Sequence, residues 1–307
     1  MSFLYLLESI RLPFLDSFFS AVTHLGEETI FIIIGLLFFW CIDKYEGYFI
    51  LSVGFIGTVF NQFLKILCRI PRPWVKDPDF TIVESARGEA TGYSFPSGHT
   101  QSSVGSFGSI ARWNKNKVLR TICIVLCVLI PFSRMYLGVH TPADVLVSVA
   151  VALLLIFGLY PLIKKTVEKP RLMWWLIAAM SAVSLALLLF VELYNFPADI
   201  DINNYKSALK NGYTLTGCVA GLAVTYFVDT HYTHFETKAV CWAQALKLIG
   251  GAVLVFGIKA GLKAPLLALC GGHHIATLIR YFLLVVVAGA VWPMTFKYFA
   301  KLEKKEK

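Results

Sequence analysis

The chain has 307 residues, of which 57% are hydrophobic and 15% are charged, whereas ordinary soluble proteins have about 45–50% apolar residues. The apolar residues form blocks of about 20, the length at which a helix crosses the hydrocarbon core of a bilayer. This pattern excludes a disordered chain, a collagen, a coiled coil and a small disulfide scaffold, and it indicates an integral membrane protein.

The net charge is +9, from 28 Lys and Arg residues against 19 Asp and Glu residues. The basic residues cluster in short loops between the apolar blocks, as the positive-inside rule describes, so we expect no nucleic-acid partner. The seven cysteines have no zinc-site or disulfide-framework spacing. Cys41, Cys123, Cys127 and Cys218 fall inside apolar blocks, and we expect them to be small core residues.

Residues 1–25 are predicted to form an interfacial helix, because Phe14, Phe18 and Phe19 are interrupted by Arg11 and Asp16. Nine spans are expected to follow, at about 27–45, 47–67, 97–113, 118–138, 142–163, 172–193, 212–229, 245–262 and 274–297. The predicted fold class is therefore all-α, a polytopic transmembrane helix bundle of about nine spans. The span at 97–113 carries Gln101 and several serines, so we expect it to lie inside the bundle rather than against lipid.

A basic stretch at 164–171 suggests two regions, residues 1–165 and an additional transmembrane bundle at 166–307. Two pairs in the second region, Gly217/Gly221 and Gly257/Gly261, have the spacing that suits close helix packing. The positive-inside rule assigns the basic loops near 112–120 and 164–171 and the lysine-rich C-terminal tail to the cytoplasm. The N-terminus, the 68–96 loop and the 133–141 turn are then expected on the extracytoplasmic side.

Unusual polar residues on this outer side fall into three stretches. They are Lys65 to Arg72-Pro73, Pro96-Ser97-Gly98-His99, and Ser133-Arg134 followed by His140 and Asp144. Lys65, Arg72 and Arg134 would place three cations near the hydrocarbon boundary, where an unpaired cation costs about 2.5–3.5 kcal/mol. Such a cluster favours binding of a multiply charged anion, and guanidinium groups match phosphate oxygens. Ser97 is predicted to cap a helix whose N–H groups face the same anion, with Gly98 allowing close approach.

His140 and Asp144 are four residues apart at the start of a predicted helix, which places both side chains on one face. A carboxylate there can hold one imidazole nitrogen protonated and leave the other as a nucleophile. His99 would then protonate the leaving oxygen. Taken singly, Lys65 could be a snorkelling lysine and His140/Asp144 a structural pair. Their occurrence together on one side of the membrane favours phosphate chemistry.

The pattern K-x6-RP, PSGH and SR-x5-H-x3-D resembles the type 2 phosphatidic acid phosphatase (PAP2) superfamily, which also includes vanadium haloperoxidases and glucose-6-phosphatases. Every motif position matches within residues 27–163. The resemblance implies that His140 is the nucleophile and that His99 is the acid and base, while the spacing predicts that Asp144 orients His140. It also implies that Lys65, Arg72 and Arg134 bind phosphate, with no metal and no other cofactor, and the helix start at Ser97 and Gly98 is expected to bind the same phosphate.

The expected function is hydrolysis of a phosphate monoester or diphosphate, most readily of a lipid such as polyprenyl diphosphate, phosphatidate or phosphatidylglycerol phosphate. The interfacial N-terminus and the second bundle also resemble the layout of glucose-6-phosphatases, which leaves soluble sugar phosphates as an alternative. A protein that binds or transports phospholipids through the same site, without hydrolysis, is the non-enzyme alternative. The sequence does not indicate an oligomeric state.

Overall fold

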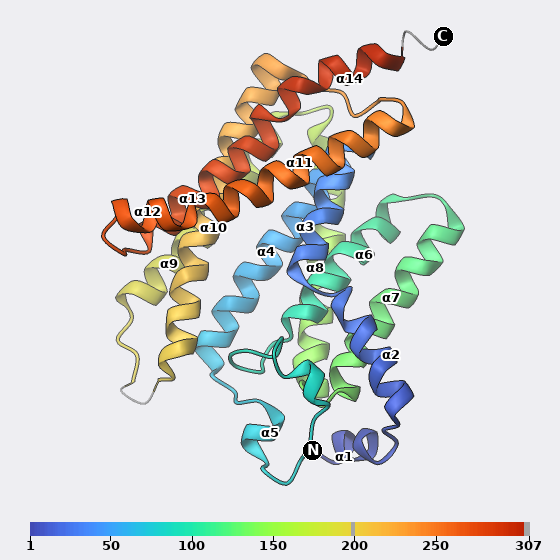
Figure 1. Ribbon diagram of the computed structural model, residues 1–307, viewed down its shortest axis with the longest axis vertical. Helices are drawn as coiled ribbons and strands as arrows, with labels where there is room; N and C mark the ends of the chain where they lie inside the picture. The colour runs from blue at the N-terminus through green and yellow to red at the C-terminus, as the bar shows by residue number, and fades with distance from the viewer. Residues whose placement is uncertain (198–199, 304–307) are drawn as a thin grey trace. The chain divides into compact units, whose positions relative to one another are not determined.

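The computed structural model describes residues 1–197 and 200–303, and its side chains are described up to residue 300. All regular structure in these residues is helical, which confirms the predicted all-α class (Figure 1). The first half contains α1 (Ser2–Ser9), α2 (Pro13–His24), α3 (Glu28–Leu37), η1 (Phe38–Ile42), α4 (Lys44–Cys68), α5 (Pro73–Lys76), η2 (Glu84–Ala86), α6 (Gly98–Trp113), α7 (Lys117–Tyr136) and α8 (Pro142–Thr166). The second half contains α9 (Arg171–Leu193), α10 (Ile202–Val228), η3 (Asp229–Thr233), α11 (Cys241–Gly261), α12 (Lys263–Leu269), α13 (Ile275–Val286), η4 (Val287–Val291), η5 (Pro293–Thr295) and α14 (Phe296–Glu303).

The expected nine membrane spans are not confirmed. Among the described residues, six helical segments are long and apolar enough to cross a membrane: Lys44–Lys76, Lys117–Tyr136, Pro142–Thr166, Arg171–Leu193, Cys241–Leu269 and Ile275–Ala300. A seventh is formed if α2 and the α3–η1 segment, bent by 48° at their junction, make one span. The predicted spans at 97–113 and 212–229 are helices but are not among these six segments. The helix α6 has only 16 residues and is rich in serine, and glycines, threonines and tyrosines lower the mean hydropathy of α10. Residues 304–307, with three of the tail lysines, lie outside the described residues.

The chain forms two compact units, and each unit is built from three separate stretches of the sequence. The first comprises residues 1–34, 49–162 and 199–207, and the second comprises residues 35–48, 163–198 and 208–307. All the residues in the three polar motifs belong to the first unit. The functional division at residue 165 stays a prediction.

In the first unit, α6 lies inside the bundle as its polarity predicted. Gln101 and the serines of its inward face are buried, and α6 runs back along α7 after the short 114–116 connection (Figure 1). The serine hydroxyls donate to backbone carbonyl oxygens one turn earlier: Ser106 Oγ lies 2.7 Å from the Ser102 oxygen. Because these hydrogen bonds are made within the helix, α6 can be polar and buried at once.

The N-terminal helices pack on the C-terminal end of α7. Phe19 of α2 lies against Tyr136, with ring centroids 4.4 Å apart, and the Tyr136 hydroxyl donates to Asp16 Oδ1 at 2.9 Å. Phe19 and Tyr136 share an apolar cluster with Ala86, Ala90, Leu137 and Val139. This cluster fixes the 84–90 segment and the 137–140 turn beside one another, and the turn carries His140.

In the second unit, close packing occurs at one of the two predicted glycine pairs. A Cβ atom at Gly217 would lie 2.3 Å from the Leu278 carbonyl oxygen, and one at Gly221 would lie 2.8 Å from that of Phe282. Only glycine therefore permits this contact between α10 and α13. The prediction for Gly257 and Gly261 was wrong, because a Cβ at either position would meet nothing within 4 Å.

Candidate active site

The PSGH stretch ends a loop and begins α6. Ser97 is the N-cap residue, and its Oγ accepts a hydrogen bond from the Thr100 backbone N–H at 3.3 Å. The Ser97 N–H donates to the Asp144 carbonyl oxygen at 3.1 Å, and Ser148 Oγ donates to the Ser97 carbonyl oxygen at 2.9 Å. These bonds tie the N-terminus of α6 to the first turns of α8. A Cβ at Gly98 would meet nothing within 4 Å, so the space beside this helix start is open.

His140 lies in the turn between α7 and α8, and its imidazole meets Asp144 one helical turn later. Gly138, with φ of +80°, allows the chain to reverse there. His140 Nδ1 is 3.3 Å from Asp144 Oδ2, and the same oxygen accepts from Ser94 Oγ at 2.6 Å and from the Thr141 N–H at 2.8 Å. Both residues are buried. The hydrogen bonds from Ser94 and Thr141 hold the Asp144 carboxylate in place, with its Oδ2 facing His140 Nδ1.

Arg72 uses all its donor nitrogens at this site. Nε donates to the Gly92 carbonyl oxygen at 3.0 Å, and Nη2 donates to that of Thr91 at 2.8 Å. Nη1 donates to the Val139 carbonyl oxygen at 2.9 Å and to His140 Nε2 at 2.8 Å. Arg72 therefore joins the 91–92 loop to the turn that holds His140.

Arg134, near the end of α7, is 0% exposed and only partly satisfied. Its Nη1 donates to Thr23 Oγ1 at 2.7 Å, but its Nε and Nη2 are buried without a hydrogen-bond partner among the described residues. An uncompensated buried guanidinium is costly, so this arrangement favours an anion beside it. Lys65 Nζ donates to the Tyr93 carbonyl oxygen at 2.6 Å.

The charged residues predicted from the sequence lie close enough to His140 to change the pKa of its imidazole. Burial lowers the pKa of His140 well below its ordinary value of 6.5, and the positive charges of Arg72, Arg134 and Lys65, with His99, lower it further. The imidazole is therefore neutral near pH 7, the form that can act as a nucleophile. His99 Nε2 is buried without a hydrogen-bond partner in the described part of the chain.

Every predicted residue thus lies at or beside one site. Direct contacts link Arg72, His140 and Asp144, the Ser97 backbone is bonded to Asp144, and the charges of Lys65, Arg134 and His99 all act on His140. Sequence reasoning missed Ser94 and Thr23, because a serine in a loop and a threonine in an amphipathic helix carry no signal of a distant partner. Within residues 1–197 and 200–303, no group of three or more His, Cys, Asp or Glu side chains is arranged to hold a metal ion.

Comparison with protein families matches residues 46–168 to the PAP2 superfamily and residues 213–305 to the PAP2 superfamily phosphatase, transmembrane extension. The chain is 31% identical to phosphatidylglycerophosphatase B of Bacillus subtilis over 165 residues, which cover 48% of this chain and 75% of that protein. It is 33% identical to undecaprenyl-diphosphatase BcrC of Bacillus subtilis over 104 residues, covering 34% of this chain and 51% of the relative. Over 237 residues it is 23% identical to human sphingosine-1-phosphate phosphatase 2, covering 73% of this chain and 54% of the relative. No solved structure matches the chain significantly.

The transmembrane extension and the long apolar helices make this chain an integral, multi-pass membrane protein. The family match covers all three polar motifs, from Lys65 to Asp144. With the similarity to phosphatidylglycerophosphatase B, which extends over three quarters of that relative, these findings place the chain in the PAP2 superfamily.

Proposed function

We propose that the protein is a membrane lipid phosphatase that hydrolyses a phosphate monoester or diphosphate through a phosphohistidine on His140, without a metal. The family match and the three relatives, each named for a phosphorylated lipid, support the lipid class. Polyprenyl diphosphate, phosphatidate and phosphatidylglycerol phosphate are the substrates we propose to test first.

The observation that carries this proposal is the unsatisfied charge around His140. Arg134 is buried with two nitrogens unpartnered among the described residues, and Lys65 and Arg72 add two further cations that act on His140. A phosphate with two negative charges would accept hydrogen bonds from these groups and offset their charge. The N–H groups at the start of α6, beyond Ser97, would add to the same anion site.

In the first step, His140 Nε2 attacks phosphorus. A P–N bond forms while the P–O bond to the leaving group breaks. His99, which takes up a proton when the negatively charged phosphate binds beside it, donates that proton to the departing oxygen. The lipid leaves as an alcohol, or as a lipid monophosphate when the substrate is a diphosphate. Lys65, Arg72 and Arg134 stabilise the equatorial oxygens of the transition state, a role that metal ions fill in many phosphoryl-transfer enzymes.

In the second step, His99 accepts a proton from water as the water oxygen attacks phosphorus. The P–N bond breaks, inorganic phosphate leaves, and both histidines return to their starting forms. Asp144 stabilises the protonated edge of His140 in both steps, because its Oδ2 lies 3.3 Å from Nδ1.

We also place this site on the extracytoplasmic face, with the N-terminus outside and the C-terminus in the cytoplasm. The support is the basic loops at 112–120 and 164–171, which lie at the ends of α6, α7 and α8 opposite to the site.

The test is turnover by the purified protein in detergent with polyprenyl diphosphate, phosphatidate, phosphatidylglycerol phosphate and glucose 6-phosphate. We expect hydrolysis of at least one lipid, loss of about 10³-fold or more in His140→Ala, and unchanged turnover in the control His231→Ala, which alters an exposed histidine of the second unit. Acid-quenched labelling should trap an acid-labile phosphohistidine. Hydrolysis of glucose 6-phosphate alone would favour the sugar-phosphate alternative, and phosphate binding without turnover of any substrate would favour the non-enzyme alternative.

A further inference from the structure

Thr23 of α2 makes a buried hydrogen bond to one cation of the candidate site. Arg134 is 0% exposed and Thr23 is 3% exposed, and Arg134 Nη1 donates to Thr23 Oγ1 at 2.7 Å. The other two guanidinium nitrogens, Nε and Nη2, have no hydrogen-bond partner among the described residues, and within that part of the chain Arg134 forms no ion pair with a carboxylate. Nε and Nη2 lie on one edge of a guanidinium and can donate two parallel hydrogen bonds to a single oxyanion. Thr23 therefore occupies the nitrogen outside this fork and leaves the fork available.

The position of Thr23 is set by the packing of α2 on α7 (Figure 1). The two helices run antiparallel. Asp16 of α2 accepts from the Tyr136 hydroxyl at 2.9 Å, and just beyond the other end of α2 a Cβ at Gly26 would lie 2.8 Å from Ile130 Cγ2. Thr23 lies between these two contacts, on the buried face of α2. Because a threonine side chain has few rotamers in a helix, the packed helix determines where its hydroxyl lies.

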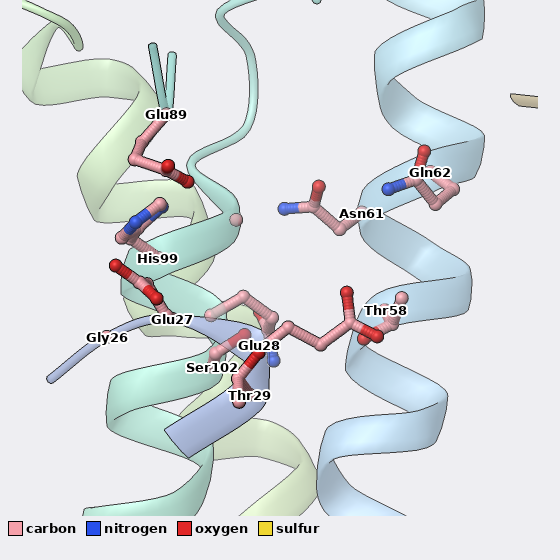
Figure 2. Close-up of a pocket in the computed structure, with 12 residues that line it drawn as sticks. Gly26, Glu27, Glu28, Thr29, Thr58, Asn61, Gln62, Glu89, His99 and Ser102 are labelled. Atoms are coloured by element: carbon pink, nitrogen blue, oxygen red, sulfur yellow. The ribbon is translucent and has the colours of Figure 1, made fainter. Parts of the chain in front are cut away.

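The same end of α2 borders the start of α6, which carries His99. A Cβ at Gly26 would lie 3.2 Å from the His99 carbonyl oxygen. Together with His99, the side chains of Glu27, Glu28 and Glu89 line a cavity of about 280 Å³, and Figure 2 shows His99 between Glu89 and Glu27. The end of α2 is therefore part of the wall of the candidate site, on the side of the proposed acid.

Thr23 lies outside the three polar motifs and outside residues 46–168, which match the PAP2 superfamily. We infer that Thr23 is a positioning residue for the phosphate site: its hydroxyl holds Arg134 so that Nε and Nη2 together donate to one phosphate group. The charge of Arg134 acts on His140, so the fork lies near the proposed nucleophile. The inference rests on the proposed function, because it concerns the phosphate that the site at His140 would bind.

The test measures two properties of variants of the purified full chain. They are the equilibrium binding of inorganic phosphate, and kcat/KM with whichever of the three proposed lipids wild type hydrolyses fastest. Thr23→Val keeps the branched shape and removes the acceptor, so phosphate should bind about tenfold more weakly and kcat/KM should fall about tenfold or more, as expected for loss of a hydrogen bond to a charged group. If Thr23→Val does not fold, Thr23→Ala takes its place with the same expected result.

Two further variants are controls for the loss of the hydroxyl. Thr23→Ser keeps the acceptor, so phosphate binding and kcat/KM should stay close to their wild-type values. Ser20→Ala removes another hydroxyl of α2, one that bonds to Ser85 Oγ at 2.7 Å, and it should leave both properties unchanged. A serine variant as impaired as the valine variant would overturn the inference.

A double-mutant cycle separates positioning of Arg134 from general support of the fold. Arg134→Lys retains a positive charge but has no guanidinium fork. If Thr23 acts through Arg134, Thr23→Val should cause no further loss of phosphate binding or of kcat/KM in the Arg134→Lys background. A merely structural role would give the same loss, about tenfold, in both backgrounds.

Failure of this inference differs from failure of the proposed function. Wild-type properties in Thr23→Val, or additive losses in the cycle, would overturn the role of Thr23 alone, because turnover by wild type and its loss in His140→Ala would remain. If wild type neither binds phosphate nor hydrolyses any of the lipids, the proposed function is wrong and the inference is wrong with it.

Discussion

Nη1 of Arg72 donates a hydrogen bond to Nε2 of His140, at 2.8 Å. A guanidinium has no acceptor, so Nε2 holds the lone pair and Nδ1 holds the proton that faces Asp144. This is the tautomer that the proposed nucleophile needs. Arg72 therefore stabilises the reactive form of His140 before substrate arrives, and an incoming phosphate must take over this donor.

Arg72→Lys should lower kcat by about 10²-fold or more, because a lysine cannot bond the 91–92 loop, Val139 and His140 together and cannot form a forked contact with phosphate. Steady-state kinetics with the best lipid substrate would measure this. Arg69→Lys is the matched control on the same connection, and the prediction would be contradicted if both variants kept wild-type kcat.

Asp144→Asn should lower kcat by about 10³-fold with little change in KM, because an amide can stabilise the wrong imidazole tautomer. Ser94→Ala removes only one donor to the carboxylate, at 2.6 Å, and should cost less than about tenfold. Single-turnover measurement of phosphohistidine formation would separate the two effects, and an Asn variant as fast as wild type would exclude the orienting role.

His140 should make the folded protein less stable in acid. Its pKa lies well below the ordinary value of 6.5 because of burial and then the charges of Arg72, Arg134 and Lys65. Below about pH 6.5 the unfolded chain binds a proton at this histidine that the folded protein does not, so the free energy of unfolding falls by about 1 kcal/mol per pH unit. Thermal unfolding at pH 7.5 and pH 5.5 should show a larger drop in Tm for wild type than for His140→Gln. Equal drops would show that His140 does not have a lowered pKa.

Ser97→Ala should reduce stability by about 1 kcal/mol, since it removes the acceptor for the Thr100 N–H at the N-terminus of α6. Ser106→Ala, in the same helix, removes a hydroxyl that bonds only to carbonyls of its own helix, and it should change Tm less. Thermal unfolding of the two variants in one detergent tests this comparison.

Removal of divalent metals should leave turnover unchanged, because three cationic side chains surround the proposed nucleophile and supply the charge that a metal would otherwise provide. Activity in excess EDTA, with and without added Mg²⁺, measures this. A strict Mg²⁺ requirement would contradict the proposed mechanism.

The contact between His140 and Asp144 was predictable because the two residues are close in the sequence. Pro142 begins α8, and Asp144 follows His140 by one helical turn, so the spacing alone places the carboxylate at Nδ1. The cap at Ser97 is likewise a short-range hydrogen bond. The number of spans was less predictable. The helices α6 and α10 contain so many polar residues that hydropathy alone does not tell whether they cross the membrane.

By itself, the amino-acid sequence determined that this is an all-helical membrane protein and predicted which side chains would act on phosphate, since hydropathy and short-range spacing are properties of the chain. The tertiary structure decided which groups from distant segments meet: Arg72 with His140, Ser94 with Asp144, Thr23 with Arg134, and the glutamates with His99 around one cavity. Arg72 and His140 are 68 residues apart along the chain, Ser94 and Asp144 are 50 apart, and Arg134 and Thr23 are 111 apart. Their encounter depends on helix packing and loop paths, which no local pattern encodes.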